Sequence, residues 1–212
     1  TNQTNQINQT NQINQTNKMN QINQPKIAAV VITKDEERNI GPCLESLRWT
    51  DEIIVVDACS GDRTVEIARQ YTDRLFVRAW PGFGPQKNFG IDKTNADWVL
   101  VVDADERVTE PLQKEILALL RTGPPADVAG FEIPRRNYFY GKWIRGGGVY
   151  PDYQLRLFRR SAGRYDDVLL HERLQLDGTE FESMIRLLQS RWDVTIGRFL
   201  DPASSEPASR TR

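Results

Sequence analysis

Short apolar runs of strand length, each followed by a segment with helical features, constrain the fold of this chain more than any other feature. These runs span residues 27–32, 53–56, 75–77 and 98–102. A continuous apolar run of this length is typical of a strand that is covered on both faces. Apolar strands that alternate with helices predict βαβ units. We therefore expect an α/β fold with a mostly parallel central sheet flanked by helices.

The intervening segments have the spacing and the end signals of helices. Apolar residues recur at positions 40, 43, 44 and 47, with Asn39 available as a cap and Pro42 in the first turn. Further helices are expected over residues 65–68 and 86–93. Another is expected from Pro111 onward, where one face carries Leu112, Ile116, Leu119 and Leu120. Each would act as a crossover between strands, and such crossovers are right-handed.

The pattern changes after residue 128. Residues 130–133 and 154–158 are expected to be strands with no helix between them, which predicts a small C-terminal part with mixed or antiparallel pairing. An aromatic, glycine-rich loop from Asn137 to Gly148 separates these strands. Farther along, a helix is expected over Met184–Gln189 and an unstructured end over residues 201–212.

The chain divides into three expected parts. Residues 1–24 repeat a three-residue unit rich in Asn and Gln, which offers too little apolar surface to offset the entropy lost on ordering. We expect a disordered arm there, with a sticky, partner-binding arm as the alternative. Residues 25–178 are expected to form the folded domain. Residues 179–212 are expected to be an atypical segment, either truncated or disordered.

Composition excludes some classes of function. The formal net charge is -1, which gives no reason to expect a nucleic-acid partner. No run of 18 or more apolar residues is present, so no transmembrane helix is expected. Cys43 and Cys59 fit no zinc or redox spacing. We expect two buried, reduced thiols and a cytoplasmic location.

Acidic residues follow three of the predicted strands, at the edge where open α/β sheets bind ligands. The clusters are Asp35-Glu36-Glu37, Asp57 with Asp62, and Asp103-Ala104-Asp105-Glu106. Carboxylates at one edge repel each other unless a cation lies among them. Because hard oxygen ligands suit Mg²⁺ or Mn²⁺, Asp103 and Asp105 are predicted to bind such an ion. The alternative is that these residues only cap the helix that begins near Pro111.

Phosphate-binding glycine loops are missing from the sequence. There is no GxGxxG after the first strand and no GxxxxGK[ST], which argues against dinucleotide-binding and P-loop proteins. Phosphates would then be held by the metal and by basic side chains, with candidates Lys87, Arg156, Arg159 and Arg160. Arg156 is favoured because it lies between Leu155 and Leu157 on a strand and can fork onto a diphosphate. For Arg159 and Arg160, ordinary surface charges on a solvated strand face are as good an explanation as phosphate binding.

Two carboxylates are candidates for a general base. Glu172 follows the single histidine, His171, at the end of an apolar run. Such a pair could supply a base with an imidazole neighbour, although a lone histidine is usually structural. Asp152 is the rival base, with Asp166 and Asp167 behind it.

The ordered set of motifs resembles the family 2 glycosyltransferases with the GT-A fold. The resemblance rests on Val30-Val31-Ile32-Thr33 before Asp35-Glu36-Glu37, on Ile54-Val55-Val56-Asp57 before Ser60-Gly61-Asp62-Arg63-Thr64, and on Val101-Val102-Asp103-Ala104-Asp105-Glu106. Later motifs are similar to the bacterial subgroup related to lipopolysaccharide-core β-glucosyltransferases: Gln86-Lys87-Asn88-Phe89-Gly90, Gly147-Gly148-Val149-Tyr150-Pro151-Asp152, Gln154-Leu155-Arg156-Leu157-Phe158-Arg159 and His171-Glu172. The match covers roughly residues 26–178 and makes residues 25–178 the expected catalytic domain.

The resemblance implies an inverting, metal-dependent hexosyltransferase that uses a nucleotide-diphosphate sugar, with a UDP-sugar favoured. Thr33, Glu37 and Asp57 would line the nucleoside pocket, with Lys87 and Asn88 nearby. Asp103 and Asp105 would hold the ribose and, through the metal, the diphosphate, where Arg156 would add charge.

The resemblance also assigns the acceptor half of the reaction. Glu172 would accept the proton of the acceptor hydroxyl. His171 would orient the Glu172 carboxylate or join the ligands of the metal. The acceptor would be a cell-envelope glycan or a lipid-linked saccharide, reached at the inner face of the plasma membrane. The aromatic residues Tyr138, Phe139, Tyr140 and Trp143 could contact an acceptor or a membrane surface, or fill the core.

Residues 179–212 depart from the subgroup, whose members continue with helical, aromatic-rich sequence. Two other interpretations therefore stay open. One is a nucleotide-sugar-binding remnant with impaired catalysis. The other is a haloacid-dehalogenase-like phosphatase, in which an Asp-x-Asp motif normally ends the first strand, whereas here three α/β units precede it.

Overall fold

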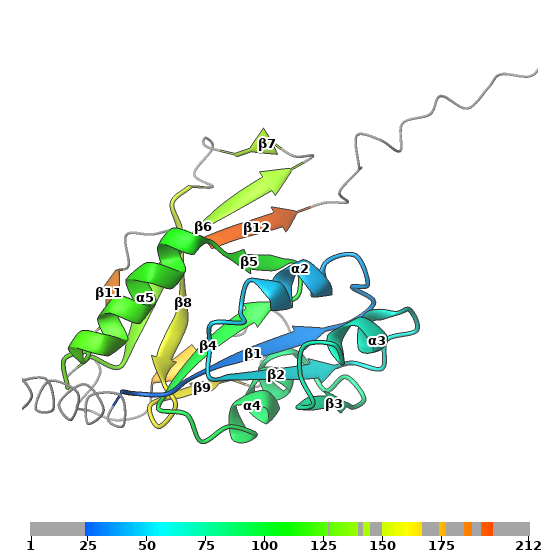
Figure 1. The fold of residues 1–212 in the computed structure, drawn as a ribbon, viewed down its shortest axis with the longest axis horizontal. Helices are drawn as coiled ribbons and strands as arrows, with labels where there is room; N and C mark the ends of the chain where they lie inside the picture. The colour runs from blue at the N-terminus through cyan, green and yellow to red at the C-terminus, as the bar shows by residue number, and fades with distance from the viewer. Residues whose placement is uncertain are drawn as a thin grey trace, which may run out of the picture.

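A computed structural model describes residues 24–126, 128–139, 142–144, 150–166, 174–176, 185–187 and 192–196. In the first half of the chain, strands alternate with helices (Figure 1). The strands are β1 (Ile27–Thr33), β2 (Glu52–Asp57), β3 (Leu75–Val77) and β4 (Trp98–Asp103). The helices are α2 (Ile40–Glu45), α3 (Thr64–Ala68), α4 (Phe83–Asp92) and α5 (Glu110–Thr122). The predicted α/β class is confirmed.

The first four strands are parallel and lie in the order β3-β2-β1-β4. The register of β1 places Thr33 beside Asp57 and Ile32 beside Asp103. Because carboxyl ends of parallel strands meet at one edge of a sheet, both aspartates lie at that edge. This arrangement confirms the predicted clustering of acidic strand ends.

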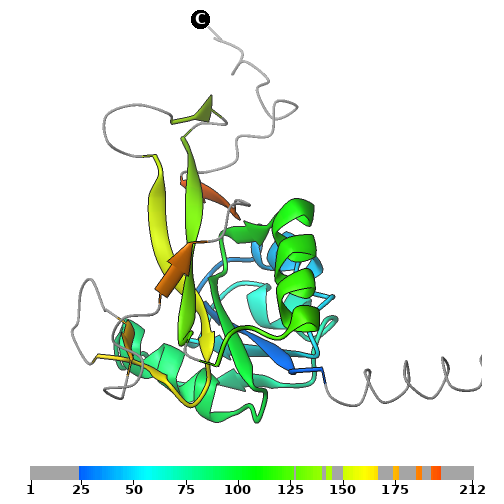
Figure 2. The same ribbon diagram turned by 90° about the vertical axis from the view of Figure 1, so that its left-hand side faces the viewer.

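Beyond β4 the sheet becomes mixed, as expected after residue 128. Strand β8 (Asp152–Arg159) pairs antiparallel with β4 and with β6 (Gly130–Phe139); Figure 2 shows β6 and β8 side by side. The same sheet includes β5 (Glu106–Val108), β7 (Lys142–Trp143), β11 (Ile185–Leu187) and β12 (Trp192–Ile196). A separate two-stranded sheet is formed by β9 (Gly163–Tyr165) and β10 (Leu174–Leu176). A mostly parallel core with a smaller mixed part, flanked by helices, fits the GT-A fold.

The helix predicted over Met184–Gln189 is wrong. This stretch contains strand β11, which pairs in parallel with β6 through Ile185 and Gly130. Strand β12 also lies in the segment 179–212, and it pairs with both β6 and β5. An open sheet edge offers backbone N–H and C=O groups to another segment of the same chain. Pairing at such an edge overrides a weak local preference for helix.

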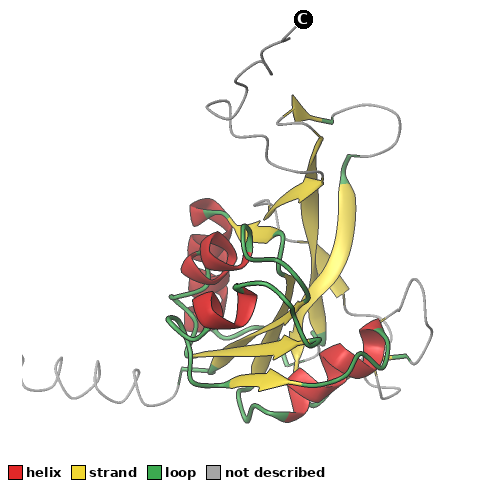
Figure 3. Ribbon diagram, turned by 90° about the vertical axis from the view of Figure 1, so that its right-hand side faces the viewer, coloured by secondary structure: helices red, strands yellow, loops and turns green. Residues whose placement is uncertain are grey.

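Two apolar layers pack on opposite faces of the parallel strands. Helices lie on both sides of these strands (Figure 3). Ala29 and Val31 of β1 belong to the layer that contains residues of α2, α3 and α5. Ala28 and Val30 belong to the opposite layer, which contains Ile91 of α4. Burial of alternate side chains on both faces explains why the strand sequences are continuously apolar.

Close packing of α4 on β1 depends on glycine. A Cβ atom at Gly90 would lie 2.4 Å from Cγ1 of Val30, so a larger residue would push the helix away. Because α4 connects β3 to β4 in the same sheet, it runs back against the strands, and its N-terminal turns lie near their carboxyl edge. That placement brings Lys87 to the edge that carries Asp103.

Three smaller expectations are tested by the described residues. Asn39 does not cap α2 through its side chain, which donates instead to Glu36 at 2.7 Å. Cys43 is buried as expected, but Cys59 is exposed because it lies in the turn after β2. Within the described part of the chain, no helix is long and apolar enough to cross a membrane.

Candidate active site

A cleft of about 570 Å³ opens at the carboxyl edge of β1 and β4. It is lined by Ile32, Thr33, Lys34, Glu36, Trp80, Phe83, Asp103, Ala104 and Asp105. Acidic side chains and the exposed rings of Trp80 and Phe83 therefore share one cleft. The two rings contact each other edge to face, with centroids 4.7 Å apart. Such a cleft suits a ligand that has both a flat ring and charged groups.

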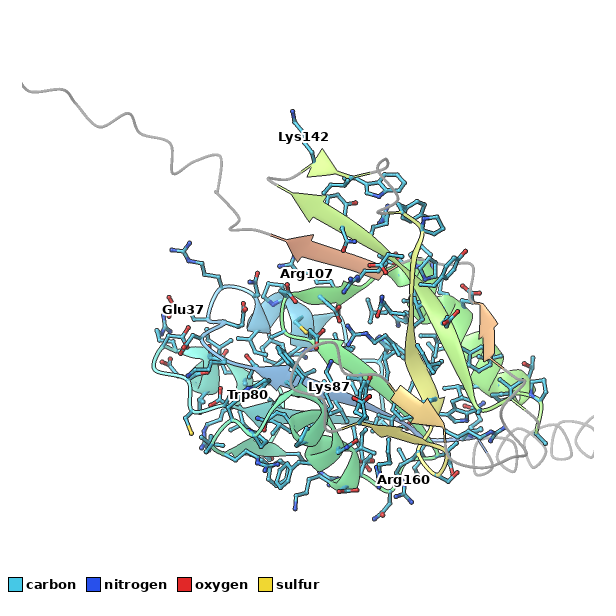
Figure 4. All side chains as sticks on the ribbon, turned by 180° about the vertical axis from the view of Figure 1, so that it is seen from behind. Glu37, Trp80, Lys87, Arg107, Lys142 and Arg160 are labelled. Carbon is cyan, nitrogen blue, oxygen red and sulfur yellow. The ribbon has the colours of Figure 1, made fainter. Side chains whose placement is uncertain are left out.

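Asp103 is held between two cationic side chains. The Lys87 ammonium lies 3.3 Å from Oδ1, and Nη2 of Arg156 donates to Oδ2 at 2.8 Å. Lys87 and Arg156 are almost fully buried, and Figure 4 labels Lys87 among the surrounding side chains. Burial alone would raise the pKa of Asp103, but the charges of Arg156 and Lys87 outweigh burial and hold this pKa well below its usual range. Asp103 is therefore ionised.

Asp105 has a different environment. Burial, followed by the charges of Asp103 and Glu36, raises the pKa of Asp105 to about 6. Among the residues that the structure describes, no basic side chain forms an ion pair with this carboxylate. An unneutralised carboxylate beside two others is a site where a cation is favoured. The described residues contain no ready-made cluster of three or more His, Cys, Asp or Glu side chains for a metal.

Glu106 lies behind the cleft, 1% exposed. Its Oε2 accepts the backbone N–H of Asp103 at 2.8 Å, and its Oε1 accepts from Nη2 of Arg156 at 3.1 Å. Burial raises the pKa of Glu106 to about 8, Arg156 opposes that shift and Asp103 adds to it. The sequence motifs predict no role for Glu106, although its position directly after Asp105 is a usable signal.

The loops after β1 and β2 are joined by hydrogen bonds and form one side of the site. The N–H groups of Asp35, Glu36 and Glu37 donate, at 2.8, 2.7 and 3.1 Å, to side chains of the second loop and of the first residue of α3. The acceptors are Ser60, Thr64 and Asp62. Asp35 and Cys59 have positive φ angles of 53° and 58°, a conformation uncommon for non-glycine residues. The contacts hold both loops in one conformation.

Three residues that were predicted to line the nucleoside pocket lie on this side of the site, but their roles differ. Thr33 lines the cleft, and its buried hydroxyl has no hydrogen-bond partner within the described part of the protein. The buried Asp57 carboxylate accepts from the N–H and the hydroxyl of Ser60, which holds the second loop. Glu37 is exposed and lies outside the cleft lining, whereas its neighbour Glu36 lines it.

Asn88 supports the site instead of lining the cleft. Its amide donates to the carbonyl of Tyr165 at 2.8 Å and accepts the Tyr165 N–H at 2.9 Å. These bonds attach β9 to α4. The ring of Tyr165 in turn lies 5.1 Å from the Lys87 ammonium. Asn88 thus helps to position the residue that packs against Lys87.

Asp152 is the candidate base that the structure describes, and it is tightly held. Arg135 contacts its Oδ2 through Nε at 2.8 Å and Nη2 at 2.6 Å, and Gln154 donates to Oδ1 at 2.7 Å. Burial alone would raise the pKa of Asp152, but the bond from Gln154 and the charge of Arg135 lower it. A lowered pKa makes this carboxylate a poor proton acceptor. The rival base Glu172 and its neighbour His171 lie outside the described residues.

Arg159 and Arg160 do not belong to the cleft. Arg159 pairs with Trp98 at the start of β4 and donates to the carbonyls of Val128 and Pro125 at 2.8 and 3.0 Å. Its guanidinium lies over the Trp98 ring. Arg160 follows at the same end of the strand, and Figure 4 shows it apart from Lys87. Of the four basic candidates, the described structure brings Lys87 and Arg156 to the acidic edge.

The sequence motifs do not single out the aromatic residues at the cleft. Trp80 lies in the segment that connects β3 to α4, and Phe83 is the first residue of α4. No periodic pattern there distinguishes a ligand contact from a core residue. Tyr138 and Trp143, considered as acceptor contacts, lie outside the cleft lining, and each ring packs near the Arg136 guanidinium. The side chain of Phe139 and all of Tyr140 lie outside the described structure.

Comparison with known sequences gives a family match. The sequence model described as Glycosyl transferase family 2 matches residues 28–173. The lipopolysaccharide core biosynthesis glycosyltransferase LpsC of Rhizobium meliloti (strain 1021) is 33% identical over 145 residues, which cover 66% of this chain and 53% of LpsC. An uncharacterized glycosyltransferase of Rickettsia typhi is 44% identical over 92 residues, covering 43% of this chain and 32% of that protein. The chain spans about half, or less, of the length of these relatives.

Solved structures show the same fold. S. aureus TarS 1-349 in complex with UDP-GlcNAc superposes with a TM-score of 0.58 at 19% identity, covering 87% of this chain and 62% of that chain. S. aureus TarS 1-349 has a TM-score of 0.58 at 18% identity and covers 80% of this chain and 60% of that chain. At this identity the likeness concerns the fold.

Proposed function

The chain belongs to glycosyl transferase family 2, and we propose that it transfers a hexose from a nucleotide-diphosphate sugar to a hydroxyl acceptor with inversion. The observation that carries this proposal is the pairing of Asp103 with Lys87 and Arg156 beside the unneutralised carboxylate of Asp105. Buried cations next to a carboxylate pair can accept a diphosphate together with its counterion. The phosphatase alternative is not proposed, because the chain belongs to the glycosyltransferase family.

A divalent cation, Mg²⁺ or Mn²⁺, fits the donor set of the cleft. Asp105 is the first ligand in this proposal because its carboxylate is not ion-paired, and Asp103 is the second. Such an ion, when bound, supplies positive charge to the leaving nucleoside diphosphate. Lys87 and Arg156 contact the two oxygens of Asp103 and would contribute fixed positive charge to the same group. His171 is a further proposed ligand.

The nucleoside is proposed to lie against the loops after β1 and β2. Thr33 offers its buried hydroxyl, and Asp57 and Glu37 hold the two loops in place. Asn88 acts through Tyr165. The favoured donor is a UDP-sugar, supported by the fold shared with TarS, which was crystallised with UDP-GlcNAc. A preformed wall of this kind lowers the entropy lost when the donor binds.

Glu172 is proposed as the general base that takes the proton from the acceptor hydroxyl. Support comes from the environment of its rival: Asp152 is held by Arg135, and its pKa is lowered. Asp152 then serves to fix Arg135 near the cleft. Attack from the face opposite the leaving group inverts the anomeric centre.

The acceptor is proposed to be a cell-envelope glycan or a lipid-linked saccharide. This rests on the similarity to LpsC, a protein of lipopolysaccharide core biosynthesis. The corresponding location is the cytoplasm, with peripheral contact at the inner face of the plasma membrane.

The decisive experiment is a donor screen. UDP-sugars are expected to raise the melting temperature of the protein when Mn²⁺ or Mg²⁺ is present and not in EDTA. Slow, metal-dependent hydrolysis of the same donors would report turnover without an acceptor. Absence of any thermal shift with every nucleotide sugar tested would remove the transferase proposal. Binding without hydrolysis would instead favour a nucleotide-sugar-binding remnant.

A further inference from the structure

Glu106 is a buried carboxyl group for which the proposed reaction has no direct use. It is 1% exposed and does not belong to the cleft lining, so it cannot touch a donor bound there. Burial of a carboxylate is unfavourable unless its oxygens are paired. Each oxygen of Glu106 accepts a hydrogen bond from a different part of the donor site, and these two contacts indicate its task.

The first observation concerns the strands around the site. Strands β4 and β8 pair only from Trp98 to Leu100, opposite Leu157 to Arg159. Beyond Leu100 the two strands have no backbone ladder, and β8 continues beside β6 as far as Asp152. Asp103 and Arg156 therefore face each other where their strands have separated. Backbone hydrogen bonds do not set their separation there.

The second observation is the bridge that Glu106 builds at this point. Its Oε2 accepts the backbone N–H of Asp103 at 2.8 Å, which fixes the end of β4. Its Oε1 accepts from Nη2 of Arg156 at 3.1 Å, the same nitrogen that donates to Asp103 at 2.8 Å. Arg135 of β6 approaches Oε1 at 3.8 Å. One side chain thus connects β4, β8 and β6.

We propose that Glu106 is a positioning residue for donor binding, which holds the Asp103 carboxylate and the Arg156 guanidinium in a fixed relation where β4 and β8 part. The inference rests on the proposed function, since it assumes that Asp103 and Arg156 bind the donor diphosphate. Without Glu106 the Asp103 N–H loses its acceptor, and Nη2 of Arg156 loses one of the two carboxylates that it contacts. Donor binding would then have to order both groups again.

The experiment measures donor affinity separately from stability. The wild-type chain is first titrated with UDP and with GDP in Mn²⁺, by calorimetry. Glu106→Ala is expected to weaken binding of whichever nucleotide binds by about tenfold or more, because charged hydrogen bonds that order the site are lost. Glu106→Gln, which keeps one acceptor oxygen of the same reach, is expected to have an intermediate Kd. It also covers the case in which the alanine variant does not fold.

Glu52→Gln is the matched control. Glu52 accepts from Arg74 at 2.9 Å and from Thr94 at 2.8 Å, but at the start of β2, the opposite edge of the sheet. It should lower the melting temperature without changing Kd. A purely structural role for Glu106 would give the same result, and would overturn the inference. So would a glutamine variant that binds as weakly as alanine. If the wild-type chain binds no nucleoside diphosphate, the proposed function fails, and this inference fails with it.

Discussion

The ammonium of Lys87 lies 3.3 Å from the carboxylate of Asp103, with one group on a helix and the other at the end of a strand. The pair forms because Gly90 lets α4 approach β1 closely, which brings the first turns of the helix to the carboxyl edge of the sheet. Lys87 is 2% exposed, so solvent water does not compete with Asp103 for its ammonium group. A bound diphosphate would meet a charge that is already oriented.

Replacement of Lys87 tests whether this charge serves donor binding. Lys87→Gln should raise the Kd for UDP in Mn²⁺ by roughly tenfold to a hundredfold, the usual loss for one charge-assisted hydrogen bond. Lys114→Gln is the control, because Lys114 pairs with Glu110 on the exposed surface of α5. Equal affinities for the Lys87 variant and the wild type, measured by calorimetry, would exclude Lys87 from the diphosphate site.

Asp105→Asn should have opposite effects on stability and on metal binding. The pKa of Asp105 is raised from 3.8 to about 6, so the folded protein binds an extra proton between these values, and ionisation destabilises it as pH rises through them. At pH 7 in EDTA, the free energy of unfolding of the variant should therefore exceed that of the wild type by about 1 kcal/mol or more. The variant should accordingly unfold at a higher temperature. At pH 4 the difference should vanish.

In Mn²⁺ the order should reverse, because Asn cannot replace an ionised ligand. The wild type should gain melting temperature with Mn²⁺ at pH 7 and lose that gain below about pH 6 as Asp105 is protonated. A metal-induced thermal shift of the same size in Asp105→Asn would show that the ion binds elsewhere.

Trp80→Ala tests the aromatic part of the cleft. Trp80 is 44% exposed and lines the cleft beside Phe83. Loss of a ring that stacks on a ligand should weaken nucleotide binding by about tenfold, and Trp80→Phe should restore most of it. Tyr153→Ala is the control, since Tyr153 is 40% exposed and lies outside the cleft lining. If pyrophosphate binding weakened as much as UDP binding, the ring would not be the cause.

Glu172→Gln and Asp152→Asn separate the two candidate bases. The first variant should keep donor affinity and lower the rate of metal-dependent donor hydrolysis by about a hundredfold or more. The second should mainly lower the melting temperature, because Arg135 loses a carboxylate that it contacts at 2.6 and 2.8 Å. Normal turnover in Glu172→Gln, together with a slow Asp152→Asn enzyme, would move the base to Asp152.

Local features of the sequence were sufficient for the regular parts of the fold. The run Ile27–Ile32 is buried on both faces, and such burial leaves a continuous apolar pattern that is easily recognised. The segment Met184–Gln189 was predicted as a helix because its pairing partner, Gly130–Glu132 of β6, lies more than fifty residues away. Pairing at that distance leaves no local pattern.

The candidate site divides in the same way. Asp57 and Asp103 were placed at one edge from sequence alone, because each directly follows a buried parallel strand, and the register of β1 bears this out. Other features of the site depend on the paths of loops and of separating strands. Glu36 lines the cleft, whereas Glu37 does not. Glu106 contacts both Asp103 and Arg156.

The positions of the strands along the chain and the acidic residues at their ends could therefore be predicted from the sequence, since hydrophobic periodicity is a local pattern. Which carboxylates are neutralised, and which is left without a basic partner, was decided by the tertiary structure. The reason is that charges interact through space over a few ångströms, between residues such as Asp103 and Arg156 that are 53 positions apart in the chain.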